Sequence, residues 1–321
     1  MGKANTKLFI CMYHYTRELK NSRYPKIKGL DIADFRAQID FFSSHFSVVR
    51  MEDVVAAKEG DCCLPPNALL LTFDDGYSDN FNFAFPILEE YGVQGSFFIP
   101  GKTFSEHVLL DVNKIHYILA TADIDCLLKD VLERMDYYRL GSDYPSNEEL
   151  FSDYAVANRF DKKETIFVKR VLQTVLPEKI RSQISSELFE KYVGISERQL
   201  AFELYMSPDQ IRTMKRHGMH IGIHGYDHYW LGNLDHESMM NDINNALEVM
   251  DGFIDQEKWV MNFPYGNYNE NVLEYVKSKG ACLGLTTEVR VADLKQDSSL
   301  TLPRLDCNDF PPKSYNYKQI V

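Results

Sequence analysis

Two adjacent aspartates, Asp74 and Asp75, follow the apolar run at residues 69–73 and precede Gly76. Neighbouring carboxylates repel each other, and the repulsion raises one pKa unless a cation or separate partners compensate it. Enzymes with α/β folds place catalytic groups at the ends of buried strands. The aspartate pair therefore indicates a metal site and a reaction.

Two histidines, His224 and His228, come just after a second short apolar run at residues 219–223. One aspartate and two histidines form a typical three-ligand set for catalytic zinc, which leaves one coordination position open for water. The chain thus contains plausible ligands for a divalent cation, provided that the fold brings Asp75 close to both histidines.

Strand-like and helix-like segments alternate in the first hundred residues and again after residue 207. The apolar patterns predict further strands at residues 8–13, 46–49, 94–99, 259–263 and 282–286. Helices are predicted after Asp31, at residues 51–58, 81–91, 237–250 and 269–279, and after the Ser207-Pro208 start signal. This alternation favours parallel strands with helices packed outside, so residues at the carboxyl ends of the strands should share one active-site face.

Residues 102–206 have a different sequence pattern, with long charged stretches that carry apolar residues at helical spacing. We interpret them as a mainly helical insertion that forms a lid or a surface for substrate or a partner. The insertion would interrupt a catalytic domain at residues 1–312, and residues 313–321 would form a tail.

Composition restricts the class of protein. The chain has 321 residues, of which 45 % are hydrophobic, so it can bury a sizeable core. Its net charge of −12 argues against a nucleic-acid or anionic-membrane surface. No segment has the length of a transmembrane span, and residues 8–13 are too short an apolar run for a signal peptide. The six cysteines are scattered without a C-x-x-C spacing, and we therefore expect a reduced, cytoplasmic protein.

Three motifs together resemble one family. Residues 72–76 (Thr-Phe-Asp-Asp-Gly), the His-x-x-x-His pair and residues 263–266 (Phe-Pro-Tyr-Gly) occur in the order and rough spacing of NodB-type polysaccharide deacetylases, carbohydrate esterase family four. The resemblance covers residues 8–100 and 207–310. It implies an α/β fold, a distorted and partly open (β/α) barrel, with the helical insertion described above.

The resemblance also implies roles for individual residues. Asp75, His224 and His228 would bind a divalent metal, for which zinc is the first candidate and cobalt, nickel or iron are alternatives. Asp74 would be the general base that takes a proton from water. Tyr265 would offer its backbone N–H to the developing oxyanion.

Three departures from the family pattern affect this expectation. Gly225 stands where a serine or threonine is usual, which removes a hydroxyl that braces the loop but no ligand. Asn262 stands where an arginine usually pairs with the base; Arg304 is a candidate substitute, and a surface arginine beside Asp306 is the alternative. No histidine follows His236 to act as the usual late general acid, so the proton would come from His14 or from Asp74 acting in turn as base and acid.

The expected function is that of a metal-dependent hydrolase that removes an N-acyl group, most favourably acetyl, from an amino sugar. The substrate would be a glycan or a lipid-linked or nucleotide-linked precursor of a surface polysaccharide. Alternatives on the same scaffold are an N-deformylase, a ring-amide hydrolase and an O-acetyl esterase. A non-catalytic glycan-binding protein that kept the metal site is the alternative from another class.

Overall fold

The structure, a computed structural model, describes residues 6–157 and 161–320 and contains two compact units. Within the described residues, the first unit comprises residues 6–18, Gly29–His107 and 203–320. The second comprises Leu19–Lys28 and the described part of Val108–Phe202. The expected insertion at residues 102–206 thus overlaps the second unit, but the short segment at residues 19–28 also belongs there.

The first unit is built on a curled parallel sheet. Its described strands are β1 (Lys7–Tyr13), β4 (Ser47–Val48), β5 (Ala68–Phe73), β6 (Gly95–Ile99), β7 (His220–Ile223), β8 (Trp259–Asn262), β9 (Ala281–Leu285), β10 (Ala292–Asp293) and β11 (Leu305–Asp306). Hydrogen-bonded neighbours run in the order β10-β1-β5-β6-β7-β8-β9, while β11 also pairs with β1 and β4 with β5. All pairs are parallel except β1 with β10. This is the partly open barrel that the sequence predicts.

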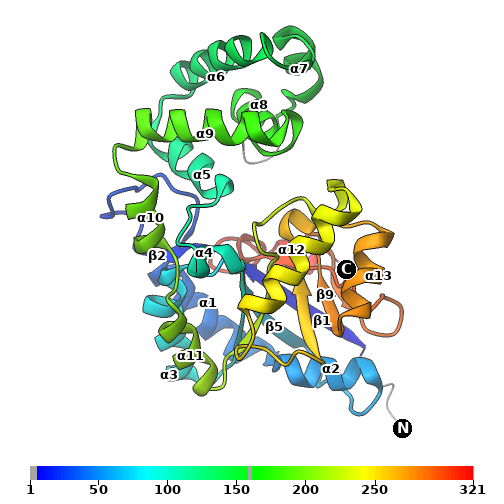
Figure 1. The fold of residues 1–321 in the computed structure, drawn as a ribbon. Coiled ribbons are helices and arrows are strands. Elements are labelled where there is room, and N and C mark those ends of the chain that lie inside the picture. The colour runs from blue at the N-terminus through cyan, green and yellow to red at the C-terminus, as the bar shows by residue number, and fades with distance from the viewer. Residues whose placement is uncertain (1–5, 158–160, 321) are drawn as a thin grey trace. The chain divides into compact units, whose positions relative to one another are not determined.

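Helices of the first unit lie around the sheet (Figure 1). They are α1 (Ile32–His45), α2 (Met51–Glu59), α3 (Phe85–Tyr91), α4 (Gly101–Ser105), α11 (Pro208–Arg216), α12 (His236–Val249) and α13 (Glu270–Ser278). A small separate sheet joins β2 (Thr16–Arg17) to β3 (Leu30–Asp31).

Both faces of the sheet are buried, which explains why its strands read as continuous apolar runs. Alternate residues of β5 belong to two different cores. Leu69 and Leu71 pack in the cluster that includes Phe35 of α1, whereas Leu70 packs in a second cluster that includes Phe98. The strand therefore needs apolar side chains at every position, and polar chemistry begins only where the strand ends.

Local signals begin two of the helices as predicted. The Asp31 side chain accepts a hydrogen bond from Ala33 N at the start of α1. Ser207 forms a capping box with Gln210 at the start of α11, with Pro208 in the first turn. One difference lies at Asn80–Ala84, where a π-helical turn precedes α3.

The C-terminal residues pack on the first unit. Tyr317 lies in a 3₁₀ turn at Asn316–Lys318, and its ring stacks on Phe310 with centroids 5.1 Å apart. The same ring also contacts Phe9 and Phe46 edge-on.

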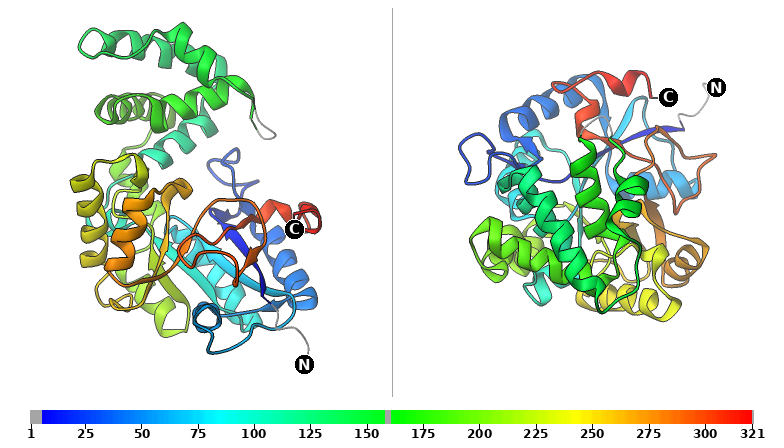
Figure 2. Two further views of the ribbon diagram at one scale, coloured as in Figure 1. Left: turned by 90° about the vertical axis from the view of Figure 1, so that its right-hand side faces the viewer. Right: turned by 90° about the horizontal axis from the view of Figure 1, so that it is seen from above.

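The second unit is helical, as the sequence predicts for this region. It contains α5 (Asp111–Thr121), α6 (Ile124–Arg139), α7 (Asn147–Tyr154), α8 (Lys163–Arg170) and α9 (Glu178–Val193). Figures 1 and 2 show these helices packed against one another. The segment at residues 19–28 joins it through Tyr24, whose ring meets Tyr117 of α5 edge-on. The last helix, α10 (Glu197–Leu204), leads back to the first unit. A function of this unit as a lid or partner surface stays a prediction.

Candidate active site and metal centre

The backbone turns sharply after β5, so the two aspartate side chains point in different directions. Asp74 N–H donates to the Tyr13 carbonyl at 2.9 Å, which extends the pairing with β1 by one residue. Asp75 then adopts a left-handed conformation with φ of 70°, and Gly76 follows with φ of 67°. A Cβ atom at residue 76 would lie 2.8 Å from Ile99 Cγ2, so this turn requires glycine. Both residues are only 2 % exposed.

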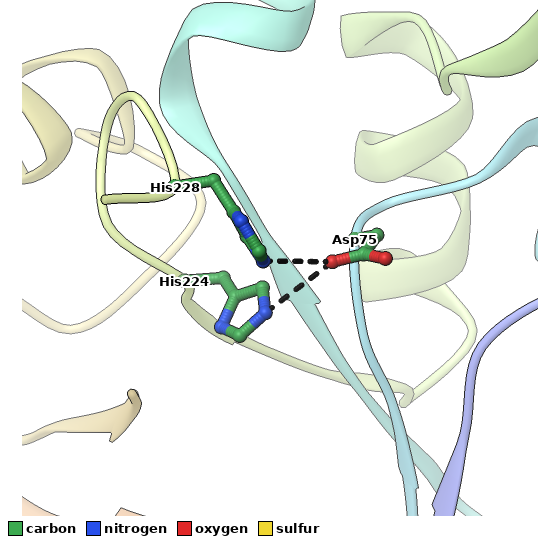
Figure 3. Close-up of side chains that lie close together, drawn as sticks. All are labelled: Asp75, His224 and His228. Atoms are coloured by element: carbon green, nitrogen blue, oxygen red, sulfur yellow. Dashed lines mark ion pairs between the residues drawn. The ribbon is translucent and has the colours of Figure 1, made fainter. Parts of the chain in front are cut away.

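Asp75, His224 and His228 converge on one point (Figure 3). Asp75 Oδ1 lies 3.4 Å from His224 Nε2 and 3.3 Å from His228 Nε2. The ligand atoms of all three residues lie within 4.8 Å of one another. No donor among the described residues forms a hydrogen bond with this buried oxygen. A buried carboxylate oxygen without a donor, facing two imidazole nitrogens, fits a divalent cation.

Neighbouring groups orient two of the three candidate ligands. The Tyr77 hydroxyl donates to Asp75 Oδ2 at 2.5 Å, so only Oδ1 faces the histidines. His224 Nδ1 lies 2.7 Å from the Asn262 carbonyl oxygen, a contact in which the nitrogen donates. That hydrogen bond selects the tautomer whose Nε2 carries a lone pair, which is the form that binds metals.

Protonation states in the site also suit a cation. Burial by itself raises the pKa of Asp75, but the two facing histidines lower that pKa by more, to well below its ordinary value. Burial lowers the pKa of His228, and the effect exceeds the opposite influence of Asp75. The site therefore holds an ionised carboxylate and, at His228, an imidazole that favours its neutral form.

Arg304 is buried and pairs with Asp74. Its Nη1 donates to Asp74 Oδ1 and its Nη2 to Oδ2, both at 2.8 Å. Arg304 Nε donates to the Thr286 carbonyl at 2.8 Å, which fixes the plane of the guanidinium group. With 1 % exposure, Arg304 is not the surface residue that the sequence left as an alternative. Burial raises the pKa of Asp74, and the charge and hydrogen bonds of Arg304 lower it by more, so the net shift is downward.

His14 extends the same cluster from the end of β1. Its Nε2 lies 3.8 Å from Asp74 Oδ2, and its side chain is 39 % exposed. Asp74 is thus bordered by a buried arginine on one side and by a solvent-accessible imidazole on another.

Tyr265 lies in a short turn at Pro264–Gly266, also with a left-handed backbone, at φ of 58°. Its ring stacks on Trp230, with centroids 4.4 Å apart, and meets His228 edge-on at 4.7 Å. Tyr265 therefore borders the candidate metal centre.

Three residues that orient the site were not singled out for that purpose from the sequence. Tyr77 could have been suspected because it follows Asp75 by two residues. Asn262 acts through its carbonyl, a group that any residue would supply, while its fully buried side-chain amide has no hydrogen-bond partner among the described residues. Asp242, discussed below, carries no local motif.

Fold and site together define a partly open (β/α) barrel with a candidate metal centre at the carboxyl ends of its strands. Comparison with known proteins is consistent with that class. A sequence model of the polysaccharide deacetylase family matches residues 62–138 and 155–283. The chain belongs to this family, and it is a hydrolase of the type that acts on amide bonds of N-acetyl sugars.

Individual relatives are distant in sequence. YxkH of Bacillus subtilis (strain 168), named among the polysaccharide deacetylases, is 19 % identical over 291 residues, covering 90 % of this chain and 68 % of that protein. The deacetylase PplD of Streptococcus pyogenes, solved in complex with acetate, is 16 % identical with a TM-score of 0.58, covering 98 % of this chain and 96 % of its own. IcaB from Ammonifex degensii is also 16 % identical, with a TM-score of 0.56 and the same coverage of 98 % and 96 %. These two structures support the fold.

The described part of the chain contains no helix with the length and apolar character needed to cross a membrane.

Proposed function

We propose that the protein removes an N-acyl group from an amino sugar in a glycan or a glycan precursor, with acetyl as the first candidate for that group. Asp75, His224 and His228 would hold a divalent cation, with zinc as the first candidate and cobalt, nickel or iron as alternatives. The observation that carries the proposal is the buried Asp75 Oδ1, which faces both Nε2 atoms and has no hydrogen-bond donor among the described residues.

When bound, such a cation polarises the acyl carbonyl and lowers the pKa of a water molecule towards ~7. Asp74 accepts a proton from the attacking water. Since Arg304 lowers the pKa of Asp74, the carboxylate is ionised and ready to accept a proton, although it is a weak base. The Tyr265 backbone N–H is the proposed donor to the oxyanion.

The leaving nitrogen also needs a proton. His14 is the proposed donor because it lies 3.8 Å from Asp74 and its side chain is partly open to solvent. Asp74 is the alternative donor, returning the proton that it took from water. Both candidate donors therefore lie next to each other, on the Asp74 side of the site.

A panel of sugars tests the reaction class. N-acetyl, N-formyl and O-acetyl amino sugars are incubated with zinc-loaded protein, and the released acid is measured. We expect the fastest release from N-acetyl substrates. Preferred N-formyl or O-acetyl substrates would instead identify a deformylase or an esterase on this scaffold.

An Asp74→Asn variant tests the catalytic role against mere glycan binding. We expect it to bind zinc as the natural protein does, because Asp74 is not in the ligand set, and to lose at least ~10²-fold in turnover. Turnover that survives this substitution would exclude Asp74 as the general base.

The acceptor is proposed to be a lipid-linked or nucleotide-linked precursor of a surface polysaccharide, handled in the cytoplasm. All six cysteines, which lie within the described residues, are free, and free cysteines are typical of a reducing compartment. Turnover of sugar nucleotides compared with that of long polymers tests this part of the proposal.

A further inference from the structure

The loop at residues 224–228 carries two of the three proposed ligands, and it begins its turn at Gly225 with φ of 69°. It lacks the side-chain hydroxyl that the family usually places at this position. We propose that Asp242 of α12 is the positioning residue of this loop. Its carboxylate holds the loop in the shape in which both imidazoles face Asp75. This inference rests on the proposed metal site and extends it.

Asp242 binds two successive backbone amides of the loop. Tyr226 N donates to Asp242 Oδ2 and Asp227 N donates to Asp242 Oδ1, each at 2.9 Å. On the other side of the loop, the carbonyls of residues 225 and 226 accept hydrogen bonds from the first two N–H groups of α4, each at 3.0 Å. The loop between the two histidines is therefore held by α4 through its carbonyls and by Asp242 through its amides.

Gly225 and Asp242 occupy complementary space. A Cβ atom at residue 225 would lie 3.0 Å from Asp242 Oδ2, and the left-handed backbone is itself unfavourable for other residues. A side chain at residue 225 would therefore press on the Asp242 carboxylate, which would have to shift by a few tenths of an ångström.

The environment of Asp242 is costly for a carboxylate. The residue is 4 % exposed, and no lysine or arginine among the described residues forms an ion pair with it. Burial raises its pKa to about 6, although its two backbone hydrogen bonds act in the opposite direction. An apolar residue would suit this buried position of α12 better. The role that accounts for a carboxylate here is to accept hydrogen bonds from the two loop amides.

The test measures zinc affinity of the metal-free protein by competition with a chromophoric chelator, for the natural protein and for Asp242→Asn. Asparagine keeps the shape but has one acceptor oxygen, so it leaves one loop amide facing its own NH₂ group. We expect zinc affinity to fall about 10–100-fold, the range for groups that orient metal ligands. Glu248→Gln is the matched control, since it removes the same charge from an exposed position of the same helix. It should leave the affinity unchanged.

A second measurement tests whether residues 225 and 242 act together on the loop. Gly225→Ala should weaken zinc binding in the natural background but cost less in an Asp242→Ala background, where the Cβ atom no longer meets the carboxylate. Asp242→Asn protein that binds zinc as tightly as Glu248→Gln would overturn the inference alone. Natural protein that takes up no zinc would overturn the proposed function, and this inference with it.

Discussion

The guanidinium group of Arg304 donates two parallel hydrogen bonds of 2.8 Å to the carboxylate of Asp74, in a site where both side chains are buried. The two residues are 230 positions apart in the chain, so this pair links the end of β5 to the residue just before β11, across β1, which pairs with both strands. A bidentate, fully desolvated pair fixes both position and charge.

Breaking this pair from the arginine side should be costly. Arg304→Ala leaves the buried Asp74 carboxylate without its guanidinium partner, and we expect a loss of about 3–5 kcal/mol in the free energy of unfolding at pH 7. Urea denaturation measures the change. In an Asp74→Asn background the same substitution should cost less, because no charge is left uncompensated. Equal losses in both backgrounds would contradict the importance of the charge.

Tyr77→Phe tests how the Asp75 ligand is oriented. The substitution removes the donor to Asp75 Oδ2, and we expect zinc affinity to fall by about 10-fold or more as the carboxylate gains freedom to rotate. Tyr13→Phe is the control, because it removes another buried hydroxyl, one that donates to Gln38 instead. If both variants bind zinc equally tightly, the Tyr77 hydroxyl does not orient the ligand.

His14→Gln tests the source of the leaving-group proton. An amide nitrogen must be protonated to leave, whereas an activated ester oxygen need not be. We expect turnover of N-acetyl sugars to fall ~10²-fold or more and hydrolysis of an activated acetyl ester to change little. Equal losses on both substrates would assign His14 a role in binding, and no loss on the amide would leave Asp74 as the acid.

The raised pKa of Asp242 predicts a pH dependence of stability in the metal-free protein. Its folded-state pKa is about 6, above the ordinary value for an unfolded chain. Between these two values the folded state binds more protons than the unfolded state, so the contribution of Asp242 to stability falls as pH rises. The free energy of unfolding of the natural protein minus that of Asp242→Asn should therefore decrease by up to about 1.4 kcal/mol per pH unit between pH 4.5 and 6. Urea denaturation at several pH values measures this difference, and a constant difference would show that Asp242 titrates as it does in the unfolded chain.

The sequence predicts the longer strands of the sheet and the convergence of Asp75 with the two histidines, because each ligand follows a strand with a clear apolar run, but it misses the two-residue strands β2, β3 and β10. The helix starts at Asp31 and Ser207 are likewise local signals. Such features depend on residues that are close together in the chain, and these local patterns can be read directly from the sequence.

Contacts between distant segments were harder to predict. The sequence left the partner of Arg304 open, since a basic residue beside Asp306 has a local partner as well. Asp242 lies on a helix with ordinary amphipathic spacing, and nothing near it signals the loop that it holds. The attachment of residues 19–28 to the helical unit depends on ring contacts such as Tyr24 with Tyr117, which no periodicity reveals.

Three side chains of the candidate site, those of Asp75, His228 and Tyr265, stand on left-handed backbone, although none is glycine. Each such conformation costs of order 1–3 kcal/mol, which the surrounding fold must offset. Selection of this protein for heat resistance alone would consequently favour glycine at these three positions. Such a variant would gain stability but lose two of the three proposed metal ligands, Asp75 and His228, while a glycine at position 265 would keep its backbone N–H.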